Sequence, residues 1–569
     1  MRVQVSAKKY RRYLKPPTGW ISTAAQMKAA LVGLDCTLGP MQLKDPAAQG
    51  INRHSVKTWR LIDSFNLVFP TTLREYAAGE FQRYFEYQHS LGDQGDIVKS
   101  RDKLWPKERF SRQHYDAYIA IIGVMGIVKL PAITDYWTTN TRRYVVPFVR
   151  RVMIRNLWQL ARHYAHFNDA SKKVQRGDRD QPSPPDGYDP IFKWRPMLER
   201  FDGFNKVWPS LVTLSNYLTF DENMIKCAMH WGLSRRQPNK PTRDGPQVYV
   251  LSESKGKWVY QVWIDQGEFD PNLRPPYHFG KTVAFILHLL VGAGALGSWS
   301  TLIIDQYFTS PLLLIVLFFL KVFCIGTCQI TRRAWPATQI FANEKANGKV
   351  KKPGEARFWF EVGARGAIKW ALACCKWYDK NEVHIACNCE TGEEQEYSLK
   401  RKGSTDAIDT RQPKMRRLYT DNKVGVDVVD QKDAALISDH GSKKSPWHRV
   451  HDSFVNTAMT LALEHFDLVI TAFGSEEQRR HLNRLRHDAV EARWELLEQL
   501  TEEAHFGVEN PNVSTLQRGR AQKNKAAADE EEGGEEDENE YEFAGEEEDA
   551  EDGSDDEGEG SAPRPRPEP

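Results

Sequence analysis

Four aspartates stand where their carboxylates could bind divalent cations together. Asp221 and Asp305 each follow a short apolar run, YLTF and WSTLII, that is typical of a buried strand. Asp427 and Asp430 stand at i and i+3 in GVDVVDQ and therefore share one face of a predicted helix. Carboxylate oxygens suit hard cations, and two such ions about 4 Å apart can activate water and stabilise the leaving oxygen of a phosphodiester. The aspartates therefore predict metal-dependent phosphodiester chemistry.

The elements that must position these aspartates predict a mixed α/β core. The first strand is expected to end at Asp221, and two Val-, Tyr- and Trp-rich runs joined by SESKG predict a β-hairpin. In chain order, the predicted elements are strand 217–220, hairpin strands 247–251 and 257–263, helix 281–291, strand 299–304, helix 309–321 and strand 322–330. This succession implies a mixed sheet covered by helices, with polar groups at the strand ends.

Helical sequence flanks this core, and strand-like sequence interrupts it. Apolar periodicity predicts a buried helix from 115 to about 131, an amphipathic helix over 150–167, and helices starting near 426 and 448. A capping box from Ser475 to Gln478 opens a Leu/Ala stripe that runs to Leu496 and is expected to pack against its own domain. The Trp-rich residues 336–414 are interpreted as an insertion, whereas no motif can be placed in residues 1–105.

The net charge of +2 hides a strong asymmetry. Of the 76 acidic residues, 20 lie between Asp529 and Glu559, a stretch with no Lys or Arg. Residues 1–528 therefore hold 76 basic and 55 acidic side chains, a net charge of +21. A body this positive attracts polyanions, most commonly nucleic acid, through counterion release. The acidic tail is expected to be disordered and to aid solubility, with binding to basic proteins or to its own basic body as the alternative.

Basic residues near two motifs are the predicted DNA contacts. They are Arg235, Arg236, Lys240 and Arg243 around PNKP, and Lys443, Lys444 and Trp447 in KKSPW. Such clusters are also common on ordinary solvated faces. The basic clusters Lys400–Lys402 and Lys414–Arg417 favour a nuclear location.

Three other patterns have plainer explanations. Gly292–Gly297 matches GxGxxG but precedes a β-branched run, so we interpret it as a helix-to-strand loop rather than a dinucleotide site. The apolar run Leu312–Leu320 is shorter than the about 20 residues that a membrane span needs, so no membrane association is expected. His384, Cys387 and Cys389 have no second ligand pair at zinc spacing, and buried structural thiols are expected there.

Several of these stretches resemble ordered motifs of the piggyBac family of DNA transposases and their domesticated derivatives. The three principal matches are FDENM (220–224), DQYFTS (305–310) and GVDVVDQ (425–431). Supporting matches are GVMGIVKLPAITDYW (123–137), NLWQLARHYAHFND (156–169), PNKP (238–241), GTCQITRRAWP (326–336), KWYDKNEV (376–383) and KKSPW (443–447). The resemblance spans roughly residues 106–470.

The resemblance implies an RNase H-like catalytic core with a three-Asp site that holds Mg²⁺ or Mn²⁺, two ions being expected. Carried onto this chain, Asp221, Asp305 and Asp427 would be the metal ligands and Asp430 an auxiliary carboxylate. The implied activity is cut-and-paste transposition of double-stranded DNA by a homodimer. In it, transposon ends are nicked, the 3′-hydroxyl forms a hairpin, and the ends join at TTAA targets.

The same resemblance sets the expected division of the chain. It runs from an N-terminal region that is partly disordered (1–105) to a first helical dimerisation and DNA-binding segment (106–215), the first part of the core (216–335), the β-rich insertion (336–414), the last Asp helix of the core (415–432), a second helical segment (433–508) and the acidic tail (509–569).

Departures from the family pattern leave two functions open. Met229-His230 stands where the family has Gly-Arg, Gln306 replaces Asn, and Val424 replaces the first Gly of G-G-V-D. A Cys-rich zinc domain like the family's is not recognised, and the acidic tail stands in its place. The chain is expected to be either a transposase or a transposase-derived nuclear DNA-binding protein that kept the fold without the reaction.

Overall fold

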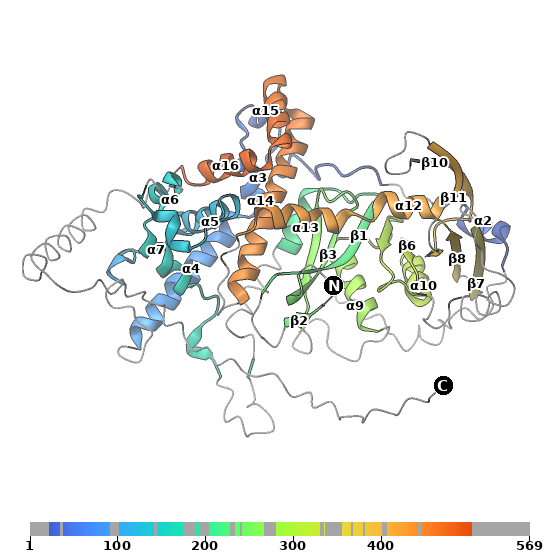
Figure 1. Cartoon of the computed structure of the whole chain (residues 1–569), viewed down its shortest axis with the longest axis horizontal. Coiled ribbons are helices and arrows are strands. Elements are labelled where there is room, and N and C mark those ends of the chain that lie inside the picture. Colours follow the sequence, from blue (N-terminus) through green and yellow to red (C-terminus); the bar gives the residue numbers. More distant parts are fainter. Residues whose placement is uncertain are drawn as a thin grey trace, which may run out of the picture.

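Helices gather at one end of the elongated molecule and a large sheet at the other (Figure 1). This computed structural model describes residues 22–34, 38–91, 102–140, 145–174, 188–189, 192, 204–227, 234–238, 242–266, 280–329, 335, 356–365, 368–378, 382–400, 407–438, 440 and 446–502. The predicted acidic tail lies outside the described residues.

The sheet has a mixed core of the predicted kind. Its described strands run in the order β2-β3-β1-β5-β6-β9-β8-β7, with β4 also paired to β3. The core strands are β1 (Tyr217–Met224), β2 (Ser234–Arg236), β3 (Asp244–Glu253), β4 (Val259–Ile264), β5 (Thr301–Ile304) and β6 (Phe323–Thr327). Strands β1, β5 and β6 are parallel, whereas β2, β3 and β4 pair antiparallel. This is an RNase H-like arrangement, as expected.

Helices cover both faces of this core. Phe220 of β1 stacks on Tyr249 of β3, which in turn stacks on Phe285 of α9 (Lys281–Gly292), so α9 covers that face. On the opposite face, Thr219 contacts the junction between α12 (Lys414–Asn422) and α13 (Gly425–Leu436). Helix α10 (Pro311–Phe319) connects β5 to β6. The Gly-rich Gly292–Gly297 segment is the predicted loop between α9 and β5.

The predicted insertion extends the core sheet instead of standing apart from it. Its strands are β7 (Ala356–Arg365), β8 (Ile368–Tyr378), β9 (Glu382–Cys387), β10 (Glu394–Lys400) and β11 (Ala407–Pro413). Strand β9 pairs antiparallel with β6, with Ile325 opposite Cys387, while β10 and β11 form their own two-stranded sheet. Helix α2 (Ala24–Leu31) packs on β7 and β8 through the buried Met27. Helix α2 comes from the N-terminal region in which no motif could be placed, and it covers the far end of the sheet.

We call the helices at the other end the helical body. They are α3 (Leu61–Val68), α4 (Thr71–Ser90), α5 (Arg112–Ile127), α6 (Pro147–Val152), α7 (Arg155–His163), α14 (Pro446–Phe473), α15 (Glu476–His487) and α16 (Ala489–Leu500). Short 3₁₀ turns occupy Ser55–Thr58, Asp102–Leu104, Ile133–Trp137 and Ala170–Lys172. The long α14 packs against α3, α5 and α13 (Figure 1).

Two predicted helices are each divided. The helix expected over 150–167 breaks at Met153, whose extended backbone presents its carbonyl to the Trp137 indole N–H at 2.8 Å. The helix expected over 475–500 breaks at Asp488, which accepts hydrogen bonds from the backbone N–H groups of Val490 and Glu491 and so caps α16. The capping box from Ser475 to Gln478 is confirmed. In the described part of the chain, none of the helices combines the length and the apolar character needed to cross a bilayer.

Candidate active site at the ends of the parallel strands

Strand register brings Asp221 and Asp305 side by side. Phe220 of β1 is opposite Ile304 of β5, and Ile304 is opposite Gly326 of β6. The next residues along the three strands are Asp221, Asp305 and Thr327, and adjacent strands are about 4.8 Å apart. These three residues therefore lie at neighbouring positions, in a row where the parallel pairing of β1, β5 and β6 ends. We call this row the strand-end row.

The first strand does not end at Asp221, as the sequence predicted. Strand β1 continues to Met224 because β3 runs beside it as far as Gln247. Asp221 therefore lies within a paired strand, where its own carboxylate accepts a hydrogen bond from the Glu222 N–H at 2.8 Å. The strand holds this side chain more rigidly than a loop would.

The residues after β5 form a loop that orients Asp305. The Asp305 carboxylate accepts hydrogen bonds from the Tyr307 N–H at 2.7 Å and the Phe308 N–H at 3.4 Å, and its carbonyl accepts one from the Thr309 hydroxyl at 2.6 Å. Ser310 caps α10 by accepting from Leu313 N–H at 3.2 Å. In DQYFTS the side chains of Asp305, Thr309 and Ser310 thus have local structural roles, whereas Gln306 and Tyr307 are exposed.

Glycine at 326 lets β6 come close enough to complete the row. A Cβ atom there would lie 2.1 Å from the Thr309 hydroxyl oxygen and 2.7 Å from the Ile304 carbonyl oxygen, distances that no side chain tolerates. The start of the GTCQITRRAWP motif is therefore explained by packing between β6 and the loop that carries Asp305.

Helix α13 is fixed to β1 two residues before Asp221. A Cβ atom on Gly425 would lie 2.4 Å from the Glu253 carbonyl oxygen and 2.8 Å from the Thr219 hydroxyl, so the helix start meets the sheet directly. Val424, where the family pattern has glycine, has φ −89° and needs no special backbone freedom. Asp427 is exposed in the first turn of α13 and Asp430 is half-buried one turn later.

The strand-end row fits part of the predicted metal centre. Paired carboxylates on neighbouring strands offer the hard oxygen donors that Mg²⁺ or Mn²⁺ prefers. Among the described residues, no group of three or more His, Cys, Asp or Glu side chains is placed to hold one metal ion. The register thus brings Asp221 and Asp305 to neighbouring positions, and the metal-binding and catalytic roles of all four aspartates stay predictions.

Sequence reasoning gave no role to Tyr419, which lies at this row. Tyr419 is half-buried on α12, and its hydroxyl makes a side-chain hydrogen bond with Thr327. Burial raises the pKa of the Tyr419 hydroxyl, the Thr327 hydrogen bond opposes this, and the negative charges of Asp305 and Asp221 raise it further. Both carboxylates therefore lie within electrostatic reach of one phenol.

The predicted DNA contacts have different environments. Arg235 and Arg236 lie on β2, which pairs with β3 beyond Met224 and hence at the same end of the sheet as Asp221. Arg236 is exposed and lies 4.0 Å from Asp244. Trp447 is only 3 % exposed, so its indole contributes to the core and cannot meet DNA in this arrangement, contrary to the prediction. The described residues include Arg243. They do not include Lys240, Lys443, Lys444, Met229 or His230.

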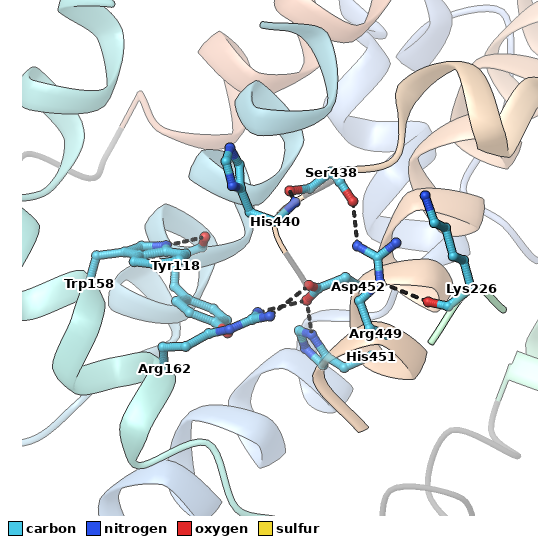
Figure 2. A network of polar contacts seen from close by, with 9 residues as sticks. All are labelled: Tyr118, Trp158, Arg162, Lys226, Ser438, His440, Arg449, His451 and Asp452. Carbon is cyan, nitrogen blue, oxygen red and sulfur yellow. Dashed lines mark hydrogen bonds and ion pairs between the residues drawn. The ribbon is translucent and has the colours of Figure 1, made fainter. Parts of the chain in front are cut away.

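A buried polar network ties this end of the sheet to the helical body (Figure 2). Arg449 of α14 donates to the carbonyl of Lys226, just after β1, at 3.2 Å and to the carbonyl of Ser438, just after α13. Nearby, Arg162 of α7 binds both carboxylate oxygens of Asp452 at 3.1 and 3.0 Å. Arg449 therefore connects the two segments that carry Asp221 and Asp427.

The fold and the strand-end aspartates define a protein with an RNase H-like core. A family model described as "Transposase IS4" matches residues 95–461, well over half of the chain. The chain belongs to this transposase family and, within it, to the piggyBac type.

Two relatives support this assignment. The human protein "PiggyBac transposable element-derived protein 2" is 23% identical over 356 residues, which cover 61% of this chain and 55% of the relative, so the chain spans about half of that protein's length. A cryo-EM structure of a piggyBac transposase synaptic complex with hairpin DNA matches with a TM-score of 0.60 and 16% identity, covering 83% of this chain and 86% of that one.

Proposed function

We propose that this chain is a piggyBac-like DNA transposase that cleaves and joins DNA with the help of Mg²⁺ or Mn²⁺. The observation that carries the proposal is the register that sets Asp221 and Asp305 at neighbouring positions where the parallel pairing of β1 and β5 ends. DNA transposases of the DDE type generally use divalent metals. Cut-and-paste transfer of double-stranded DNA at TTAA-like targets, as a homodimer in the nucleus, is the specific form of this proposal.

The chain's own residues would perform distinct tasks. Asp221, Asp305 and Asp427 would hold the ions, with Asp430 beside them. When bound, the ions would supply activation of a water or 3′-hydroxyl and stabilisation of the leaving oxygen. The amide donors of Tyr307 and Phe308 keep the Asp305 carboxylate oriented before any ion arrives. Arg235 and Arg236 at the same end of the sheet would attract the phosphate backbone.

Cleavage by matched proteins tests the reaction. The purified full chain is incubated with duplexes carrying candidate terminal repeats and TTAA, with Mg²⁺ or with EDTA. Asp305→Asn should abolish Mg²⁺-dependent cleavage, because metal positioning and charge stabilisation supply most of the catalysis in phosphodiester transfer. DNA binding should be unchanged or tighter, since one negative charge facing phosphate is removed. Equal cleavage by both proteins would reject the assigned site.

Salt dependence tests DNA binding separately. Residues 1–528 carry a net charge of +21, so affinity for duplex DNA should fall steeply between low and moderate salt with little dependence on sequence. An affinity that does not change with salt would contradict this. Including the acidic tail should weaken binding if the tail competes with DNA for the basic body.

A second candidate is a nuclear DNA-binding protein that retains the fold without the reaction. It is favoured by the relative named as transposable element-derived and by Met229-His230 at the position of the family's Gly-Arg pair. Salt-dependent DNA binding without cleavage by either the wild type or Asp305→Asn would select it.

A further inference from the structure

An exposed aromatic ring follows Asp305 on the loop after β5. The side chain belongs to Tyr307, which is 54% exposed. The Tyr307 backbone N–H donates to the Asp305 carboxylate at 2.7 Å, so its backbone is tied directly to the strand-end row. Contact with an apolar or aromatic surface of a ligand would remove this ring from water, which is favourable.

Contacts with the core fix the orientation of the ring. The Tyr307 and Phe308 rings meet edge to face, with centroids 5.1 Å apart and planes at 89°. Phe308 is 2% exposed, and its ring meets those of Phe220 on β1 and Tyr249 on β3 at 4.8 and 6.2 Å. The exposed ring therefore rests on a buried ring of the sheet core. Because Tyr307 is held through its backbone and its ring, it would lose little conformational entropy on meeting a ligand.

A nucleobase is the ligand chemistry that suits this ring. The proposed reaction brings a phosphodiester to Asp221 and Asp305, and each phosphate of DNA is joined through its sugar to a base. Inside a duplex both faces of a base are covered by its neighbours, whereas an unpaired base presents a face on which an aromatic side chain can stack. The loop after β5 thus places a stacking surface two residues from a carboxylate that the phosphate would approach.

We propose that Tyr307 stacks on an unpaired base of the DNA bound at the strand-end row and so holds the adjoining phosphate there. Tyr307 is then a substrate-contacting residue that meets a base, whereas Arg235 and Arg236 would meet the phosphate backbone. The part that concerns a reacting phosphate rests on the proposed function. Base stacking itself requires neither a metal ion nor cleavage.

Binding in EDTA tests the stacking without any reaction. The affinities of the full-length wild type, Tyr307→Ala and Tyr307→Phe are measured for a duplex with one unpaired adenine, the same duplex fully paired, and the same duplex with an abasic site in place of the unpaired adenine. Tyr307→Ala should weaken binding to the unpaired adenine by at least about fivefold, because it removes a base–aromatic stack. It should change the other two affinities by less than about twofold, and Tyr307→Phe, which keeps the ring, should bind as the wild type does.

The comparison among the duplexes decides the proposal. An equal effect of Tyr307→Ala on all three would overturn it, because the ring would then contact the DNA backbone or act through the fold. No effect on any of them would overturn it as well. Tyr307→Ala keeps the N–H that donates to Asp305, so the loop should keep its conformation. Phe473→Ala is the matched control, because Phe473 is an aromatic residue that is 36% exposed at the end of α14, and all three affinities should be unchanged.

A fluorescent adenine analogue, 2-aminopurine, reports the stack directly when it replaces the unpaired adenine. Stacking quenches its fluorescence, so the wild type and Tyr307→Phe should quench it on binding and Tyr307→Ala much less. Cleavage with Mg²⁺ is measured separately. If the wild type stacks on the base but does not cleave, the reaction in the proposed function fails and the stacking stands. If the wild type cleaves but Tyr307→Ala binds and quenches equally well, the stacking fails and the reaction stands.

Discussion

In the helical body, two buried aspartates lie against guanidinium groups, whereas two aspartates lie at neighbouring positions where the parallel pairing of β1 and β5 ends. Asp452 is 1% exposed and accepts two hydrogen bonds from Arg162. Asp116 accepts hydrogen bonds from Arg74 at 2.7 Å and from Arg112 at 2.8 Å. Asp221 and Asp305 instead follow Phe220 and Ile304, which are opposite each other on neighbouring strands.

The pKa of Asp452 shows how an arginine partner stabilises a buried carboxylate. Burial alone would raise the pKa of this carboxyl, but the Arg162 charge and the hydrogen bond with His451 hold it well below its usual range. A carboxylate stabilised in this way holds helices together. Like charges placed side by side repel each other, and a cation shared by the two carboxylates would relieve that repulsion.

Breaking the helical pair should produce the largest loss of stability. Arg162→Met leaves Asp452 as a buried charge without its guanidinium partner, and we expect the free energy of unfolding to fall by about 3–5 kcal/mol. Urea unfolding of the full chain measures this. Arg150→Met, on an exposed position of α6, is the control and should change stability by less than about 0.5 kcal/mol. Similar values for the two variants would show that the pair does not stabilise the body.

Acid should weaken the helical body through a buried histidine. Burial lowers the pKa of His465 on α14 to about 4, from an ordinary value of 6.5. Its ring nitrogens contact the Ser64 hydroxyl and the Gln49 side chain at 3.1 and 2.9 Å. Because the folded pKa is depressed, the unfolded chain takes up a proton first as pH falls, so this stabilisation is complete above about pH 6.5 and is lost toward pH 4.

The expected loss from His465 is on the order of 3 kcal/mol across that interval. His465→Asn should flatten the dependence of unfolding free energy on pH between 7 and 4.5, while His54→Asn, at an exposed position, should leave the slope unchanged. Burial also lowers the pKa of His114 to about 4, so part of the slope should remain in His465→Asn. An unaltered slope in His465→Asn would contradict the assignment.

Arg449 connects the helical body to the sheet, and its loss should lower the free energy of unfolding by an intermediate amount. Arg449 is 5% exposed and spans from the Lys226 carbonyl to the Ser438 carbonyl (Figure 2). Arg449→Met leaves the buried Ser438 carbonyl and the Lys226 carbonyl without this donor, and we expect a loss of about 2 kcal/mol. Arg449→Lys keeps the charge but cannot reach both carbonyls, so it should recover less than half of that loss. Full recovery by lysine in urea unfolding would show that only the charge matters.

Local sequence patterns predicted the core elements that carry the aspartates. The hairpin, α9, β5, α10 and β6 follow from apolar periodicity and turn residues, which act over a few neighbours. The pairing of β9 with β6 and the packing of α2 on β7 and β8 depend on contacts between distant parts of the chain, which no window of sequence contains.

The residues of the candidate site also differ in whether local sequence could predict them. Asp221 and Asp305 could be singled out because each follows an apolar run, and the register then places them together. Tyr419 could not, because its position depends on how α12 leaves the insertion and crosses β1 and β6. Trp447 was expected to contact DNA, yet its ring is buried, because a motif does not reveal whether an aromatic ring lies in the core.

Asp305→Asn should change stability least, although it should reduce cleavage most. Asp305→Asn keeps the size of the side chain and an oxygen that can accept from the Tyr307 and Phe308 amides, but it removes one of two adjacent like charges. We therefore expect the free energy of unfolding in EDTA to be unchanged or to rise by up to about 1 kcal/mol. Asp467→Asn is the matched control, because Asp467 lies 2.6 Å from Arg486 in an opposite-charge pair, and the same substitution there should lower stability by up to about 1 kcal/mol. Urea unfolding of both variants measures whether each substitution raises or lowers the free energy of unfolding. A clear loss of stability in Asp305→Asn would mean that the favourable contacts of this carboxylate outweigh its repulsion from Asp221, as the contacts of the paired aspartates in the helical body do.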